Sequence, residues 1–335
     1  VTGHVVYRAV IDCDDMPEDL RINAPVLWAG PHCHLVHYPL RGGKQYNLVV
    51  TFHSRQQEEW GVKDGSKEEV LSYFAGIHAR PRQMLDKPTS WRRWSTADRE
   101  PVEKWGTDRI TLVGDAAHLH SPAGAQGMNT GIGDAINLAW KLAAVINNQA
   151  SEQLLESYQI ERRAFAEKLV KSTDRVFSLI TAEGALAAKI RTQIAPYQLS
   201  KIYNNAPLSH FIFRIISQLG IHYRQSPLSQ GKSGKIHAGD RLPWIQQAHS
   251  NNFESLKQIL WQIHVYGTAR PELQTWCHQH NLPLSEFVWD TNCKKVGLLE
   301  NAVYLIRPDT YIALIDPQAN IDTLQQYFQK IQMKY

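Results

Sequence analysis

The sequence lacks the features that would indicate a membrane protein, a secreted protein or a protein with a cysteine-based metal site. No apolar run approaches the roughly 20 residues that a membrane-spanning helix needs, and the first residues alternate like a strand rather than forming a signal peptide. The four cysteines, Cys13, Cys33, Cys277 and Cys293, lie far apart and form no C-x-x-C pair, so neither a zinc knuckle nor a dithiol redox site is indicated. We therefore expect a cytoplasmic protein with reduced thiols and no membrane contact.

An excess of charge of one sign is also missing. The chain has 335 residues with 36 Lys and Arg against 32 Asp and Glu, a formal net charge of +4, and no long run of either sign. This balance is too mild to indicate a nucleic-acid partner. A composition of 43% hydrophobic and 20% charged residues is typical of a folded protein and excludes disorder, and the length permits two or three domains.

Residues 1–105 have the pattern of an antiparallel sheet with a covering helix. Apolar and polar residues alternate in His4–Ile11 and Gln45–Phe52, which predicts strands. Two glycines in Arg41–Lys44 can adopt the positive φ angles of a hairpin turn. Ser66, followed three residues later by a glutamate, forms a capping box at the start of a predicted helix. We expect that helix to cover one face of the sheet.

The middle region, residues 106–224, is predicted to hold a ligand-binding turn and two helices. The short apolar strand Arg109–Val113 runs into the glycine-rich loop Gly114–Gly131, which opens a helix, and a long helix follows over Glu152–Thr181. A strand, loop and helix in this order is typical of α/β ligand sites.

The end of the chain is predicted to be a separate small domain. Gln225–Gly239 is rich in Ser, Gly, Lys and Gln and is predicted to be a linker. Residues 240–335 then give strands and helices in an order that resembles a thioredoxin-like fold, without a cysteine pair after the first strand. Packing or dimer contact is therefore the expected role, rather than redox chemistry.

The chemistry of the glycine-rich loop can be inferred from its residues. Gly114 and Asp115 end the strand, which places a carboxylate where ribose or ribityl hydroxyls could be held. Gly127, Met128 and Asn129 begin the next helix, where unpaired backbone N–H groups and the helix dipole favour a negative group. A reduced flavin carries a negative charge at its N1–C2=O edge, which such a helix start would stabilise. The alternative is that this is only a glycine-rich turn, which joins a strand to a helix in many unrelated α/β proteins.

This loop is similar to the second FAD motif of the aromatic hydroxylase family of flavoprotein monooxygenases. The resemblance implies an α/β (α+β) fold of the FAD/NAD(P)-binding type, with an antiparallel substrate sheet and a thioredoxin-like C-terminal domain. It also implies that FAD is bound by the residues on the motif's positions and by an arginine in the segment before the strand. These cofactor-binding residues are Arg99, Gly114, Asp115, Pro122, Gly127, Met128 and Asn129.

A second candidate site lies in Pro31–Gly43, which reads PHCHLVHYPLRGG. Strand alternation places His34 and Tyr38 on one face and His37 on the other, so a metal site built from these histidines is disfavoured. The chain from Val1 to about Gly114 resembles the hydroxybenzoate-hydroxylating branch, the 3-hydroxybenzoate 6-hydroxylases and salicylate hydroxylases. By that resemblance His34 would be the base that helps to ionise a phenol, and Tyr38 would orient the substrate. The alternative is that these are ordinary polar residues of an edge strand.

The implied activity is an NADH- or NADPH-consuming, FAD-dependent monooxygenase. A flavin C4a-hydroperoxide would transfer a hydroxyl group to a phenolic, hydroxybenzoate-like ring, which reacts faster when a neighbouring phenolate adds electron density. The expected partners are the phenol and O2, and the flat sheet with an added domain permits a homodimer.

Two departures from the family pattern bear on this interpretation. From about Ala117 onward, including Leu119–Pro122, the sequence resembles the phenol hydroxylase branch instead, which leaves the ring position open. No G-x-G-x-x-G follows a strand, so we expect a piece of a longer protein that binds FAD weakly or not at all by itself. Two rival hypotheses are a flavin-dependent reductase or dehydrogenase without oxygen transfer, and a non-catalytic binding module.

Overall fold

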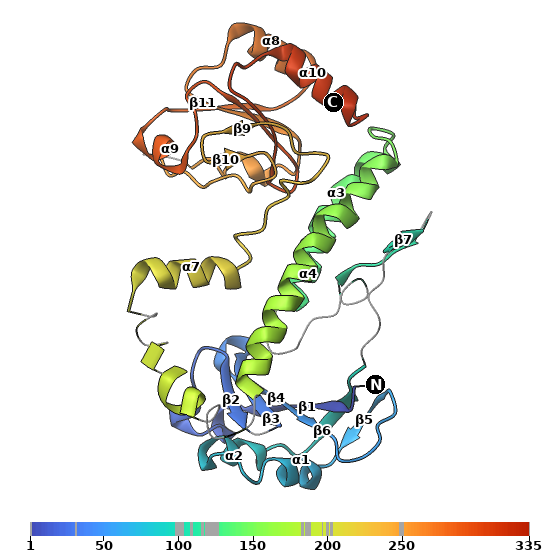
Figure 1. Ribbon diagram of the computed structural model, residues 1–335, viewed down its shortest axis with the longest axis vertical. Coiled ribbons are helices and arrows are strands. Elements are labelled where there is room, and N and C mark those ends of the chain that lie inside the picture. The colour runs from blue at the N-terminus through green and yellow to red at the C-terminus, as the bar shows by residue number, and fades with distance from the viewer. Residues whose placement is uncertain are drawn as a thin grey trace. The chain divides into compact units, whose positions relative to one another are not determined.

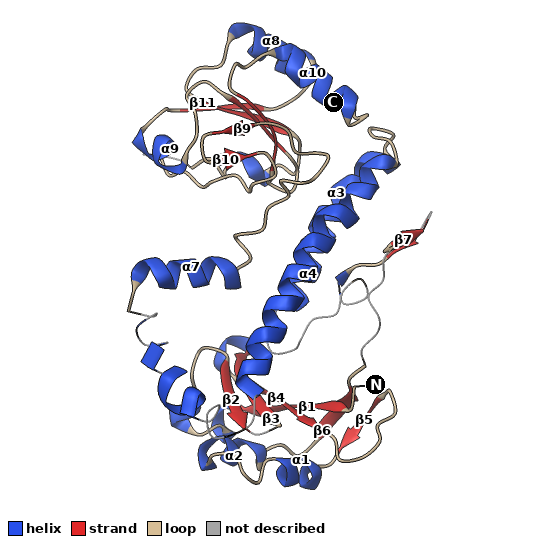
Figure 2. Cartoon of the chain, viewed as in Figure 1, coloured by secondary structure: helices blue, strands red, loops and turns tan. Residues whose placement is uncertain are grey.

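The computed structural model divides the chain into two compact units, which are described separately. Unit 1 comprises Val1–Pro101 and Asp174–Lys201, and unit 2 comprises Val102–Thr173 and Ile202–Tyr335. The elements are drawn in Figures 1 and 2. The three-part division made from the sequence stays a prediction. The structure describes residues 2–30, 32–97, 104–107, 110–114, 117, 127–181, 184, 189–195, 197–198, 201, 204–247 and 251–334.

Unit 1 contains a six-stranded sheet in the order β2-β3-β4-β1-β6-β5, and every pair of neighbours is antiparallel. This confirms the predicted antiparallel sheet. Two short helices, α1 (Lys67–Tyr73) and α2 (Ala79–Leu85), pack against it. The strands are β1 (His4–Asp12), β2 (Val26–Gly30), β3 (Cys33–Leu40), β4 (Gln45–His53), β5 (Val62–Gly65) and β6 (Trp91–Ser95).

One face of this sheet forms the core of unit 1. Alternate residues of β1, β3 and β4 turn toward α1 and α2, where Val70 and Met84 complete a continuous apolar cluster. The predicted capping box is confirmed, because the Ser66 hydroxyl accepts a hydrogen bond from the Glu69 N–H at 3.2 Å. The predicted hairpin turn is confirmed as well, with positive φ at Arg41 and at both glycines that follow it. The opposite face of the sheet therefore has none of the α1 and α2 contacts.

Unit 2 joins two long helices to a four-stranded sheet in the order β12-β11-β13-β14. The β11–β12 pair is parallel and the other two pairs are antiparallel, which is the topology of a thioredoxin-like unit. β12 and α9 were not predicted from the sequence. The last residues of α4, from Asp174 on, belong to unit 1. The elements are α3 (Gly127–Ile146), α4 (Gln153–Thr181), α7 (Ala206–Ile216), β11 (Gln262–Tyr266), α8 (Pro271–Gln279), β12 (Leu284–Phe287), α9 (Thr291–Val296), β13 (Val303–Ile306), β14 (Ile312–Asp316) and α10 (Ile321–Lys330).

The long helices share their core with the C-terminal sheet. Trp140 and Leu154 belong to the same apolar cluster as Ile263 and Phe328. The ring of Trp140 meets that of Trp261 edge to face at 5.6 Å between centroids. The helical spacing of apolar residues in α3 predicted a different packed face from the one observed, and that prediction was wrong. All residues of the predicted face are exposed except Leu142, which is half-buried: Ile132, Ala135, Ile136, Ala139, Leu142, Ala143 and Ile146.

Two local predictions were wrong. Gln225–Gly239 is not a linker, since it contains the paired strands β9 (Lys232–Ser233) and β10 (Ile236–His237) and attaches to the C-terminal sheet. The backbone of this segment forms hydrogen bonds with β14. Its polar composition therefore did not indicate a segment whose backbone groups are bound by water. The strand predicted over Arg109–Val113 is shorter, because β8 (Ile110–Thr111) pairs only with β7 (Gly106–Thr107) among the described strands.

Among the described residues, no helix is long and apolar enough to cross a membrane.

Candidate functional site

β3 carries the two residues predicted to act on a substrate. His34 and Tyr38 lie on the sheet face opposite α1 and α2, because Leu35 between them points into the helix-covered core. His34 is buried, with 8% of its surface exposed, whereas Tyr38 is half-buried. The structure therefore places both predicted residues on one face of one strand.

His34 is neutral near pH 7. Burial and, to a smaller extent, the nearby His4 together lower the pKa of its imidazole to about 4. A neutral imidazole can accept a hydrogen bond from a phenol, but its low pKa makes it a much weaker base than an exposed histidine. The assignment of His34 as the base stays a prediction.

His37 takes the opposite face, as the alternation predicted. It is fully buried, and the Trp28 Nε1–H donates a hydrogen bond to its Nδ1 at 3.2 Å. Within the part of the chain that is described, no group of three or more His, Cys, Asp or Glu side chains could hold a metal ion. His37 is therefore a core histidine held by a tryptophan.

The predicted FAD motif is described only in part. Gly114 has a positive φ of 61°, and its N–H donates to the Asp134 carboxylate at 2.9 Å. α3 begins at Gly127, as predicted, so its first backbone N–H groups have no partner within the helix. Arg99, Asp115 and Pro122 lie outside the described residues, as does the side chain of Met128.

The described backbone fits the polar edge of a flavin. A Cβ atom added to Gly114 would lie 3.7 Å from the Cα of Gly131, so loop and helix approach each other closely at two residues without side chains. Asn129 is exposed on the first turn of α3 and lines a pocket. The first N–H groups of α3 and the positive end of the helix dipole would together hold an anionic or carbonyl edge there.

A buried ion pair fixes this turn from behind. The Arg162 Nε donates to Asp134 at 2.6 Å, and its Nη groups donate to the Tyr223 hydroxyl at 3.0 Å and the Thr130 carbonyl at 3.1 Å. Asp134, which also accepts from Gly114, is fully buried. Sequence reasoning missed this pair, and the only signal was that Asp134 is one of two charged residues in α3, with Lys141.

A second buried network connects α3 and α4 to the loop between β13 and β14 of the C-terminal sheet. Glu161 accepts two hydrogen bonds from Arg307, at 2.6 and 2.9 Å, and one from Lys141 at 2.8 Å. Arg307 also donates to Asp309 at 2.9 and 2.5 Å. Burial, opposed by Glu161, lowers the pKa of Lys141 to about 8. The four charges balance, so the network is a neutral cluster that carries no exposed side chain.

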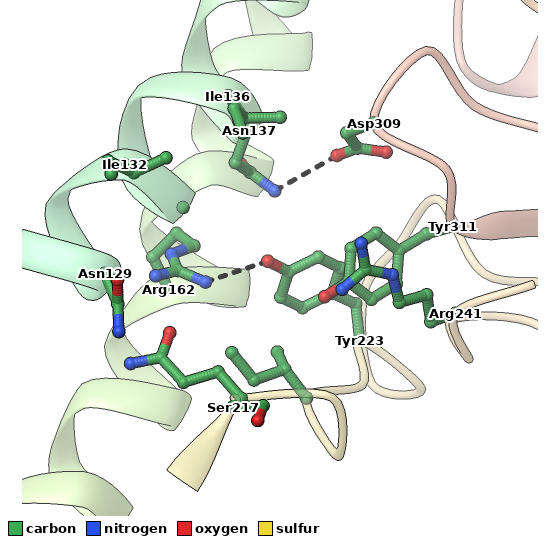
Figure 3. A pocket seen from close by; sticks show the side chains of 13 residues that line it. Asn129, Ile132, Ile136, Asn137, Arg162, Ser217, Tyr223, Arg241, Asp309 and Tyr311 are labelled. Carbon is green, nitrogen blue, oxygen red and sulfur yellow. Dashed lines mark hydrogen bonds between the residues drawn. The ribbon is translucent and has the colours of Figure 1, made fainter. Parts of the chain in front are cut away.

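A pocket of about 280 Å³ lies beside the N-terminal half of α3, as Figure 3 shows. It brings Asn129 of the flavin motif near Arg241, Tyr223 and Tyr311, which the sequence did not bring together. The dashed lines in the figure are the hydrogen bonds from Arg162 to Tyr223 and from Asn137 to Asp309. The lining residues are Asn129, Ile132, Gly133, Ile136, Asn137, Arg162, Ser217, Gln218, Ile221, Tyr223, Arg241, Asp309 and Tyr311.

Residues 15–173 match the family model described as an FAD binding domain. The chain is also similar in sequence to proteins named as aromatic hydroxylases, as its motifs predicted. It is 70% identical over 185 residues to the 3-hydroxybenzoate 6-hydroxylase of Klebsiella oxytoca, covering 55% of this chain and 46% of that protein. It is 28% identical over 324 residues to the 3-(3-hydroxy-phenyl)propionate/3-hydroxycinnamic acid hydroxylase of Klebsiella pneumoniae, covering 86% and 57%. The chain thus spans about half the length of these relatives.

Solved structures confirm the fold. The OxyS anhydrotetracycline hydroxylase of Streptomyces rimosus superimposes with a TM-score of 0.68 at 21% identity, over 98% of this chain and 63% of that one. The aromatic hydroxylase CabE gives a TM-score of 0.68 at 22% identity, over 99% and 65%. The predicted flavoprotein monooxygenase fold, with its antiparallel sheet and C-terminal unit, is therefore confirmed.

Proposed function

We propose that this chain forms the substrate-binding sheet and the flavin-facing helix of an FAD-dependent, NAD(P)H-consuming monooxygenase that hydroxylates a phenolic, hydroxybenzoate-like ring. The observation that carries the proposal is the 70% identity over 185 residues to a protein named for hydroxylating 3-hydroxybenzoate. The buried His34, on the sheet face opposite α1 and α2, supports it. We further propose a cytoplasmic protein, which its four free thiols suit, and a homodimer.

The cofactor would be held at the start of α3. FAD, when bound, would supply electron transfer from NAD(P)H and the activation of O2. Gly114 and the first residues of α3 would meet its polar edge through backbone N–H groups, and Asn129 would line the same region. The Asp134–Arg162 ion pair keeps Gly114 in place, because a turn held by a buried charge pair cannot relax when the ligand binds.

The phenol would be activated at β3. The neutral His34 imidazole would accept a hydrogen bond from the phenolic hydroxyl and draw its proton away as the ring is attacked. This partial ionisation raises the electron density of the ring carbons ortho and para to the oxygen. Tyr38, four residues along the same face, would orient the other end of the ring.

The test begins with binding and ends with turnover. The purified 335-residue chain is titrated with 3-hydroxybenzoate and with FAD by calorimetry. Because the chain by itself is expected to bind FAD weakly or not at all, NADH oxidation and chromatographic analysis of the product are carried out on a longer form that includes a G-x-G-x-x-G segment. We expect 3-hydroxybenzoate to bind, and His34→Gln to weaken that binding. His278→Gln is the control, because His278 is exposed on α8 in the other unit.

The outcomes separate the rival hypotheses. A dihydroxylated product that forms only when FAD, NADH and the phenol are all present would support the proposal in full. NADH oxidation without a hydroxylated product would favour a flavin reductase or dehydrogenase. A folded chain that does not bind the phenol would favour a non-catalytic module and would overturn the proposal, whether or not the chain binds FAD.

A further inference from the structure

Thr51 is a buried polar residue without a partner on the predicted substrate face. It lies on β4 directly opposite His34 on β3. Only 4% of Thr51 is exposed, and its hydroxyl has no hydrogen-bond partner among the described residues. A buried hydroxyl that is left unpaired lowers the free energy of unfolding, so its presence calls for a reason outside the fold. A bound ligand would supply the missing partner.

A second polar pair lies farther along the same face. Asn47 of β4 stands opposite Tyr38 of β3. Asn47 is a buried polar residue, with 7% of its surface exposed. The cross-strand pair of Val36 and Val49 lies between the two polar pairs. The face therefore presents a polar pair, an apolar pair and another polar pair in succession.

The spacing of these pairs suits a single aromatic ring with a polar group at each end. Four residues along a strand cover about 13 Å. A hydroxybenzoate spans about 7 Å between its polar oxygens, and two hydrogen bonds of about 2.8 Å each bring the distance between protein atoms to about 12–13 Å. The branched side chains of Val36 and Val49 would lie against the ring face between these ends.

We propose that Thr51 and Asn47 are specificity-determining residues for the phenolic substrate, an inference that rests on the proposed function. The Thr51 hydroxyl forms a hydrogen bond with the phenolic oxygen beside His34. The Asn47 amide donates to the carboxylate beside Tyr38. The two strands thus recognise the two substituents of the ring separately.

Two probe ligands test this assignment by calorimetry on the 335-residue chain. Thr51→Val should weaken the binding of 3-hydroxybenzoate about fivefold to tenfold, the effect of one hydrogen bond, and leave benzoate binding unchanged. Thr51→Ser, which keeps the hydroxyl, should restore most of the affinity. Asn47→Leu should weaken both ligands, because both carry the carboxylate.

Stability measurements separate recognition from a structural role. Thr51→Val should not lower the melting temperature, because a methyl group replaces an unpaired hydroxyl. Ser72→Ala is the control for ligand binding, which it should leave unchanged. It also removes a hydroxyl, but on α1, on the other side of the sheet.

Each failure has its own signature. Equal weakening of both ligands by Thr51→Val, or a lower melting temperature, would overturn the inference and leave the proposed function intact. No binding of 3-hydroxybenzoate by the unaltered chain would overturn the proposed function and the inference with it.

Discussion

Replacing Glu161 with glutamine would leave unit 2 with an unbalanced buried charge. Glu161 accepts hydrogen bonds from Arg307 and Lys141 in a cluster in which all three side chains have no exposed surface. The substitution keeps the shape of the side chain but removes the negative charge between two cations. Breaking one partner of such a buried network costs about 3–5 kcal/mol.

The expected change can be stated for both chemical and thermal unfolding. Unit 2 contains roughly 200 residues, for which each kcal/mol corresponds to about 2–4 °C in melting temperature. Glu161→Gln should therefore lower the free energy of unfolding in urea by about 3–5 kcal/mol and the melting temperature by about 6–20 °C. Circular dichroism and tryptophan fluorescence at pH 7 measure both quantities.

The pH dependence gives an independent check. Burial alone would raise the pKa of Glu161, but Arg307 and Lys141 overcome it and hold that pKa well below the ordinary value of 4.5. A carboxyl whose pKa is depressed on folding stabilises the protein above its unfolded pKa, and that contribution is lost as pH falls below about 4.5. The stability difference between the unaltered chain and Glu161→Gln should therefore shrink in acid.

The control lies two turns farther along the same helix. Glu167 is exposed and pairs with Arg163 at 3.0 Å, so Glu167→Gln should change the free energy of unfolding by less than about 0.5 kcal/mol. A loss of less than about 1 kcal/mol for Glu161→Gln, or a difference that does not narrow below pH 4.5, would refute the reasoning about the buried cluster.

Three further predictions follow from the structure. Gly239→Ala should lower the free energy of unfolding in urea by about 3 kcal/mol, because Gly239 has φ +89° and an added Cβ would lie 2.4 Å from the backbone of Tyr223. Gly220→Ala is the control and should be neutral, because a Cβ added there would meet open space. An equal loss of unfolding free energy in the two variants would contradict the explanation. Arg162→Lys should lower the free energy of unfolding nearly as much as Arg162→Met does, by about 3 kcal/mol in thermal melting experiments. The reason is that one ammonium group cannot replace three directed N–H donors. Unaltered stability in Arg162→Lys would contradict this prediction. The imidazole of His34 should titrate by NMR with a pKa of about 4, so that its contribution to stability is present above pH 6.5 and is lost as pH falls toward 4; titration near 6.5 would show that it is not buried.

Local patterns were sufficient to predict the parts of this fold that depend on near neighbours. The capping box at Ser66, the glycine hairpin after Leu40 and the alternation that separates His34 from His37 all follow from spacings of a few residues. Helix starts were also predicted, because α3 begins at Gly127 after the glycine-rich loop. These predictions held because backbone geometry fixes which side chains share a face.

Composition was a poor guide where tertiary contacts satisfied polar groups. Gln225–Gly239 has the composition of a linker, yet its backbone pairs with the C-terminal sheet. The apolar face predicted for α3 was wrong, because Ile132, Ile136 and Ile146 on it are exposed and the buried face lies elsewhere on the helix. The buried face of α3 also contains charged residues, because each finds a partner of opposite charge from another segment.

The sequence by itself determined the antiparallel sheet, the flavin-type loop before α3, the thioredoxin-like order of the last elements and the shared face of His34 and Tyr38. Each of these features depends on residues that are close together in the sequence. Only the tertiary structure decided that Arg307 meets Glu161, 146 residues away, and that Thr51 is buried beside His34 without a partner. No short-range pattern specifies such contacts, because they depend on how distant segments pack and on which polar groups that packing removes from water.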